Sequence, residues 1–101
     1  MIEICNLRNE KPVNPYDIYV DRRSVLGNPY PDRDGKSRDL VCDRYEDHFT
    51  YKSRTDNRFQ RELGRLLAIY EYHGKLRLFC WCAPKRCHAE TIKRWLERHI
   101  Q

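Results

Sequence analysis

Three short apolar runs in this chain have the composition and spacing of β-strands. Residues 2–7 and 16–20 are short and rich in apolar, β-branched and aromatic side chains, so we predict a strand at each. In a third run, residues 76–82, Leu76, Leu78, Cys80 and Cys82 alternate with Phe79 and Trp81. Apolar side chains on both faces predict a central strand that is covered from both sides, and Pro84 is expected to end it.

Three other segments show the period of three to four residues that is typical of helices. The first follows Ser37 as its cap, and its spaced residues are Leu40, Val41, Tyr45, His48 and Phe49. The second runs over residues 57–73, with Thr55 or Asp56 as its cap and Gly74 at its end. The last begins near Cys87 or His88, and its inner side carries Ala89, Ile92, Trp95, Leu96 and His99.

The predicted order of elements is β-β-loop-α-α-β-α. This order favours one small α/β domain over residues 1–101, with a mostly parallel short sheet in a layered, Rossmann-like arrangement. Two irregular segments follow predicted strands, a long one after Val20 and a short one after Cys82. Because ligands of open α/β sheets bind outside the carboxyl ends of the strands, these two segments could form one site.

The composition of the chain indicates which partners and which cellular location to expect. The formal net charge is +5 with scattered basic residues, which fits an attraction to phosphate and equally a solvated basic surface. No window is apolar enough for a membrane span, so no membrane partner is expected. The N-terminus carries Glu3 and lacks the apolar region of a secretory signal, so we expect a cytoplasmic location. The odd number of cysteines, five, does not fit a secreted disulfide scaffold.

Residues 80–88 contain three of these five cysteines, and a histidine follows the last one directly. Cys80, Cys82, Cys87 and His88 would supply three thiolates and an imidazole, a donor set that suits tetrahedral zinc. The first pair has the spacing C-x-C on a strand, whereas familiar zinc knuckles use C-x(2–4)-C. Zinc would therefore require that strand to bend, and it remains one interpretation of the segment among several.

The same segment also allows a reactive thiol, a redox pair or simple packing. Cys87 is expected at a helix start beside two basic residues, a setting that favours the thiolate and makes Cys87 a candidate catalytic nucleophile. Its general base is expected elsewhere, for example at His48 or His73, because adjacent helical residues do not face one another. A disulfide between Cys82 and Cys87 is sterically feasible across a turn. Equally, the cysteines could be buried as small apolar residues.

The segment after Val20 has the composition of an anion-binding loop. Arg22 and Arg23 carry guanidinium groups that recognise phosphate or carboxylate through paired hydrogen bonds. Ser24 and nearby backbone N–H groups could complete an anion nest, while Gly27 permits the close approach of a ligand and Asn28 begins a turn before proline. The segment matches no Walker or dinucleotide pattern, and the alternative is a turn with solvated arginines.

Two segments together resemble a known family. YDIYVDRRSVLGNPY, residues 16–30, resembles the motif Y-x-[IV]-Y-[IV]-x-R-x-S-x-x-GNP-[FY], and LFCWCAPKRCHAETI, residues 78–92, resembles the motif CWCAP-x-x-CHA. The pair is similar to DUF4326, a family of small domains from bacteria and tailed phages. This resemblance implies a compact single domain, often phage-encoded, in which both segments matter, but it lends no reaction. Leu26 departs from the pattern, since an aromatic residue is expected there.

We therefore predict a small, phage- or bacterium-encoded ligand-binding domain. Residues 22–28 and 82–88 would form a pocket for an anionic small molecule, namely a phosphate-bearing nucleotide, or for a nucleic-acid end. The phosphate would be bound by Arg22, Arg23 and Arg86. Further polar contacts would come from Ser24, Asn28 and His88, and Gly27 would let the ligand approach the backbone. Trp81 would stack on a base or pack in the core. Two alternatives stay open: an enzyme with Cys87 as nucleophile, and a zinc-stapled module that binds a host protein.

Overall fold

The computed structural model describes residues 1–30, 38–83 and 85–100, and within these ranges the chain forms three strands and three helices. The strands are β1 (Ile2–Asn6), β2 (Asp17–Tyr19) and β3 (Leu76–Cys80). The helices are α1 (Arg38–Thr55), α2 (Asn57–His73) and α3 (Ala89–His99). This order confirms the predicted α/β architecture.

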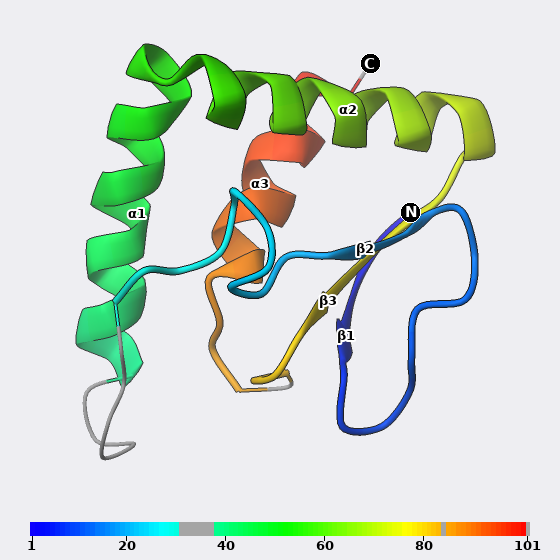
Figure 1. Ribbon diagram of the computed structural model, residues 1–101, viewed down its shortest axis with the longest axis horizontal. Helices are drawn as coiled ribbons and strands as arrows, with labels where there is room; N and C mark the ends of the chain where they lie inside the picture. The colour runs from blue at the N-terminus through cyan, green and yellow to red at the C-terminus, as the bar shows by residue number, and fades with distance from the viewer. Residues whose placement is uncertain (31–37, 84, 101) are drawn as a thin grey trace.

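β3 lies at the centre of a parallel sheet with the strand order β1-β3-β2 (Figure 1). Leu78 of β3 pairs with Ile4 of β1 on one side and with Ile18 of β2 on the other. Because all strands in the sheet are parallel, their carboxyl ends lie at one edge. The predicted central position of the third run is therefore confirmed, and the segments that follow β2 and β3 leave the sheet at the same edge.

One face of the sheet packs against the helices. Leu76, Leu78 and Cys80 point to this face and are fully buried. They belong to one core cluster with Phe59, Leu63 and Leu66 of α2 and with Ala89, Ile92 and Leu96 of α3. On the other face Phe79 is also fully buried, and the guanidinium of Arg77 lies 5.1 Å from the centre of its ring. Apolar burial, worth about 25 cal/mol per Å², thus holds a short central strand between its neighbours.

α2 begins and ends where its sequence predicts. The Asp56 carboxylate accepts hydrogen bonds from two backbone N–H groups of the first turn, at 2.9 and 3.2 Å. Gly74 ends the helix with a left-handed φ of 69°, and its N–H donates to the carbonyl of Tyr70. The bend at Asp56 turns the chain sharply from α1 into α2 (Figure 1). Ser37, the predicted cap of α1, lies outside the described residues.

β3 is shorter than predicted, and this corrects the position of Trp81. The strand ends at Cys80 because its neighbours end there: the last pairings run from the Leu7 N–H to the Cys80 carbonyl at 2.8 Å and from the Val20 N–H to the Phe79 carbonyl at 3.0 Å. Trp81 therefore lies beyond the sheet and is 49% exposed, so it is not the covered strand residue that alternation predicts.

The helices also differ from prediction in a few side chains. Leu40 is 52% exposed, and Cys42 occupies the buried face of α1 in its place, beside Tyr45. α3 begins only at Ala89, so Cys87 and His88 precede it. His99 is exposed and stacks on the Trp95 ring, with 3.8 Å between ring centres, instead of facing inward.

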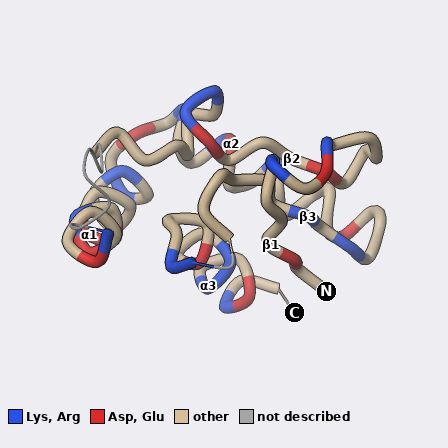
Figure 2. Tube along the Cα trace, turned by 90° about the horizontal axis from the view of Figure 1, so that it is seen from below, with Lys and Arg blue, Asp and Glu red and all other residues tan. Residues whose placement is uncertain are grey.

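Charged residues are spread over helices, strands and loops, and positive and negative ones are interspersed (Figure 2). Several of them form ion pairs between elements, such as Arg94 of α3 with Glu46 of α1 at 2.6 Å. None of the helices within the described ranges is both long enough and apolar enough to cross a membrane.

Candidate functional site

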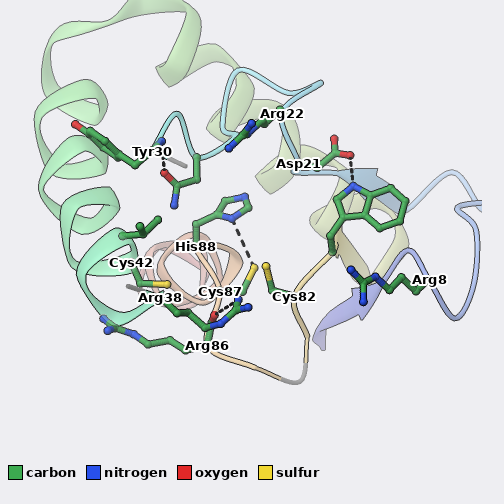
Figure 3. Close-up of a pocket in the computed structure, with 13 residues that line it drawn as sticks. Arg8, Asp21, Arg22, Tyr30, Arg38, Cys42, Cys82, Arg86, Cys87 and His88 are labelled. Atoms are coloured by element: carbon green, nitrogen blue, oxygen red, sulfur yellow. Dashed lines mark hydrogen bonds between the residues drawn. The ribbon is translucent and has the colours of Figure 1, made fainter. Parts of the chain in front are cut away.

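The segments that follow β1, β2 and β3 line one cavity with the first turn of α1, next to the carboxyl edge of the sheet (Figure 3). The cavity has a volume of about 470 Å³. Its lining residues are Arg8, Asp21, Arg22, Asn28, Tyr30, Arg38, Val41, Cys42, Trp81, Cys82, Arg86, Cys87 and His88. The two irregular segments singled out from the sequence thus meet in space, as expected for the ligand site of an α/β sheet.

The segment after β2 folds through two consecutive tight turns. The Ser24 N–H donates to the Asp21 carbonyl, and the Gly27 N–H donates to the Ser24 carbonyl, both at 2.9 Å. The Ser24 hydroxyl accepts from the Leu26 N–H at 3.0 Å, which leaves Leu26 fully buried beneath the loop. A Cβ at Gly27 would lie only 2.4 Å from the Asp21 carbonyl oxygen. Glycine is therefore required here because the loop backbone approaches itself, whereas the sequence suggested an approaching ligand.

Asp21 fixes the indole of Trp81 at the cavity wall. Its carboxylate accepts from Trp81 Nε1 at 3.0 Å and from the Arg23 guanidinium at 2.9 Å. Burial acts to raise the pKa of Asp21, but the hydrogen bonds from Arg23 and Trp81 hold this pKa below its usual value. Asp21 is therefore an ionised acceptor, and Arg23 neutralises it while lying over the Tyr19 ring.

His88 connects the turn before α3 to the end of β2. Its Nε2 donates to the Val20 carbonyl, and because a carbonyl can only accept, Nδ1 of the neutral ring is left as an acceptor. This Nδ1 lies 3.6 Å from the sulfur of Cys87 (Figure 3). Burial lowers the pKa of His88, so the neutral ring is favoured. The ring also meets the buried Tyr45 ring edge-on, at 5.1 Å between centres.

The histidine beside Cys87 is therefore its sequence neighbour, not His48 or His73. The expectation of a distant base assumed that both residues lie within a helix, but they precede α3, and the backbone there lets the two side chains meet. His48 instead packs among the rings of Tyr30, Tyr45 and Phe59. His73 lies at the far end of α2, against Tyr16 and Tyr72.

Three thiols form a cluster next to His88. The thiol of Cys87 lies beside the thiols of Cys80 and Cys82, and the guanidinium of Arg38 lies beside Cys82. The contacts with its two neighbours, together with burial, raise the pKa of Cys87 well above its usual value. The hydrogen bond from Cys87, assisted by Arg38 and opposed by burial, lowers the pKa of Cys82 to about 5. The contact with Cys87, opposed by burial, also lowers the pKa of Cys80, to about 7. Cys82 therefore has the lowest pKa of the three and is the first of them to take a negative charge.

Four arginines reach the cavity from four separate segments: Arg8, Arg22, Arg38 and Arg86. Arg86 is already paired, with Asp39 at 3.0 Å and Asp43 at 2.8 Å, and so it joins the turn to α1. In the part of the chain that the structure describes, Arg8 and Arg22 have no acidic partner and both are exposed. These two guanidinium groups can accept an anionic ligand without first breaking an ion pair.

The sequence prediction of the site is partly matched by the lining of the cavity. The predicted residues that line it are Arg22, Asn28, Trp81, Cys82, Arg86, Cys87 and His88, and those that do not are Arg23, Ser24, Gly27 and Cys80. Arg8, Tyr30 and Arg38 were missed. Arg8 is the second residue after β1, so the rule that places sites at the carboxyl ends of parallel strands could have found it. Tyr30 is the last residue of the first motif, which could have indicated it, whereas no local pattern marks Arg38.

Metal binding finds no support in the geometry of the described residues. Within residues 1–30, 38–83 and 85–100, no group of three or more His, Cys, Asp or Glu side chains is arranged to hold a metal ion. His88 directs Nε2 to a carbonyl and Nδ1 to the sulfur of Cys87. All five cysteines have free thiols. Zinc at Cys80, Cys82, Cys87 and His88 stays a prediction, which native mass spectrometry of the purified protein would test.

The comparisons with known proteins bear on the two motifs that build this cavity. The family model described as Domain of unknown function (DUF4326) matches residues 5–98, which include both motifs. Neither the curated proteins nor the solved structures contain a significant match to this chain. With nearly its whole length covered by the family model, the chain belongs to the DUF4326 family.

Proposed function

We propose that the cavity binds a phosphate-bearing nucleotide, either as a small molecule or at the end of a nucleic acid. The observation that carries this proposal is the convergence of Arg8, Arg22, Arg38 and Arg86 on one cavity at the carboxyl edge of a parallel sheet. Asp21 is the acidic side chain among the lining residues, and it is neutralised by Arg23. The cavity therefore carries an excess of positive charge, which favours an anionic ligand.

The size and aromatic walls of the cavity support a nucleotide over a bare anion. A volume of about 470 Å³ falls within the range of roughly 300–1,000 Å³ that is usual for small-molecule sites. Trp81 is half exposed, and its indole is oriented by the hydrogen bond to Asp21. Stacking of a base on such an aromatic face contributes about 1–3 kcal/mol. Tyr30 lines the cavity as a second aromatic residue.

The alternatives from the sequence have less support as first stated. Cys87 is only 3% exposed and its thiol is surrounded by sulfur and imidazole, so an external substrate has little access to it. A zinc-stapled module that binds a host protein lacks an arranged ligand set in the described residues. The proposed compartment is the cytoplasm, where reducing conditions keep contacting thiols such as Cys82 and Cys87 free.

A thermal-shift panel tests the proposal. The unmodified protein is heated with nucleoside mono-, di- and triphosphates, the matching nucleosides, inorganic phosphate, and short single-stranded DNA with and without a terminal phosphate. A ligand that binds the folded state raises the midpoint temperature by mass action. We expect phosphate-bearing nucleotides or phosphorylated ends to raise this temperature and nucleosides not to do so. If no member of the panel raises it, the proposed function is wrong.

A further inference from the structure

Among the three clustered thiols, only that of Cys82 both lines the cavity and is partly exposed. Cys80 is the last residue of β3 and is fully buried against the helices, and Cys87 is 3% exposed. Cys82 is the second residue after β3, at the edge where the arginines gather, and its sulfur lies next to that of Cys87 (Figure 3). A ligand in the cavity would therefore meet the sulfur of Cys82 first.

The surroundings of Cys82 favour its negatively charged form. The thiol of Cys87 and the guanidinium of Arg38 both lie beside the sulfur of Cys82, and the single thiol proton of Cys87 can be donated to that sulfur. Nδ1 of His88, at 3.6 Å, is the competing acceptor for that proton, and the negative charge on Cys82 makes its sulfur the stronger acceptor. The sulfur of Cys87 itself accepts a hydrogen bond from the N–H of Ala89 at 3.5 Å. A charge on Cys87 would be buried away from solvent, whereas a charge on Cys82 faces a cavity lined by arginines.

We propose that Cys82 is the nucleophile of the cavity and that it attacks an electrophilic atom of a small, phosphate-bearing anionic ligand. This inference rests on the proposed function, because the arginines that bind phosphate also bring the ligand to the thiol. In the reaction, a lone pair of the Cys82 sulfur forms the new bond to the electrophilic atom. The bond from that atom to its leaving group breaks, and the leaving group departs with the electron pair. Cys87 keeps its proton and acts as a positioning residue.

Alkylation of the unmodified protein tests this assignment without a variant. The protein is treated at pH 6 with limiting iodoacetate or iodoacetamide, and the label at each of the five cysteines is measured by peptide mass spectrometry. Both reagents form a sulfur–carbon bond and release iodide, but only iodoacetate is anionic. We expect Cys82 to react roughly tenfold faster than 2-mercaptoethanol at this pH, since its thiolate fraction outweighs its lower intrinsic nucleophilicity. We also expect the rate ratio of iodoacetate to iodoacetamide to be several-fold higher at Cys82 than at 2-mercaptoethanol.

The outcomes separate this inference from the proposed function. If Cys82 reacts no faster than 2-mercaptoethanol, or shows no preference for the anionic reagent, the inference is overturned, while a nucleotide that raises the midpoint temperature would still uphold the proposed function. Protection of Cys82 from alkylation by such a nucleotide supports both. In a third outcome, Cys82 reacts fast and prefers the anionic reagent, but no nucleotide raises the midpoint temperature. This result supports Cys82 as the nucleophile and shows that its ligand is not a nucleotide. Cys82→Ser serves as the control for peptide assignment.

Discussion

Nε2 of His88 donates a hydrogen bond to the backbone carbonyl of Val20, which joins the turn before α3 to the residue that follows β2. Each residue lies in one of the two motifs that identify the family, and 68 positions separate them in the chain. The contact is buried and positions the two walls of the cavity relative to each other. It joins the two segments of this chain that resemble the motifs of the family.

Replacement of His88 should lower the stability of the whole domain. In His88→Gln the buried carbonyl of Val20 and the thiol of Cys87 lose the imidazole as their partner, and an unpaired buried polar group costs about 1–3 kcal/mol. We expect the free energy of unfolding, measured by urea titration, to fall by about this amount. His73→Gln is the control, because His73 is exposed at the end of α2 and its replacement should change stability by less than about 0.5 kcal/mol. Equal effects of the two replacements would contradict the role of His88.

Stability should also fall in mild acid, and His88 should carry part of this effect. Burial lowers the pKa of His88, and burial together with Lys52 lowers that of His48, both from an ordinary value of 6.5. Below that pH the unfolded chain binds more protons than the folded one, so the free energy of unfolding decreases as the pH falls. Urea titrations at several pH values between 7 and 5 should show a shallower decrease for His88→Gln than for the unmodified protein. An identical slope in both would show that His88 is not a buried neutral ring.

Gly27 should tolerate no side chain, unlike Gly64. A Cβ at Gly27 would lie 2.4 Å from the Asp21 carbonyl oxygen, and relief of that contact must shift the loop backbone, at a cost of about 1–3 kcal/mol. Gly64 lies within α2 with no atom near its Cβ position, so Gly64→Ala should stabilise the protein by about 0.5–1 kcal/mol. Thermal or urea unfolding of the two alanine variants measures both effects. Similar signs for the two changes would contradict the observed packing of the loop.

Much of the fold could be predicted from the sequence because it depends on local patterns. The apolar period of α2, the cap at Asp56 and the end at Gly74 are all local and were predicted correctly. The central position of β3 followed from apolar residues on both faces. The length of β3 could not be derived in this way, because the strand ends where its neighbours end, and alternation alone extended it to Cys82.

The candidate site could be predicted only in outline, since it is assembled from distant segments. The two loops were expected to converge, and they do. The side-chain partners were not predictable: Arg23 pairs with Asp21, Arg86 pairs with α1, and Arg8 enters from the segment after β1. The difference between Cys87 and Cys82 likewise depends on burial and on which thiol faces the cavity, and neither property is encoded by the spacing of the cysteines.

Cys87 should control the reactivity of Cys82 through its thiol proton. In Cys87→Ala the hydrogen bond to Cys82 is lost, so the pKa of Cys82 should rise from about 5. The alkylation rate of Cys82, followed from pH 4 to 9, should then show its midpoint at a higher pH, and Cys87→Ser should partly restore the lower midpoint because serine also donates. Cys5→Ala is the control, since Cys5 is a buried thiol that does not line the cavity and whose charged neighbours are Arg77 and Glu10. An unchanged midpoint in Cys87→Ala would show that Cys87 does not act on Cys82.

The central claim, that the arginine-lined cavity binds a phosphate-bearing nucleotide, is tested most directly by isothermal titration of the stabilising nucleotide into three proteins. Arg22→Ala removes from the cavity a guanidinium that has no acidic partner among the described residues, and Arg61→Ala removes the same charge from the exposed surface of α2. A charged hydrogen bond contributes about 1.5–3 kcal/mol, so the account predicts that Kd rises by about tenfold or more in Arg22→Ala and stays unchanged in Arg61→Ala. The same Kd for Arg22→Ala and the unmodified protein, or an equal rise in both variants, would contradict it.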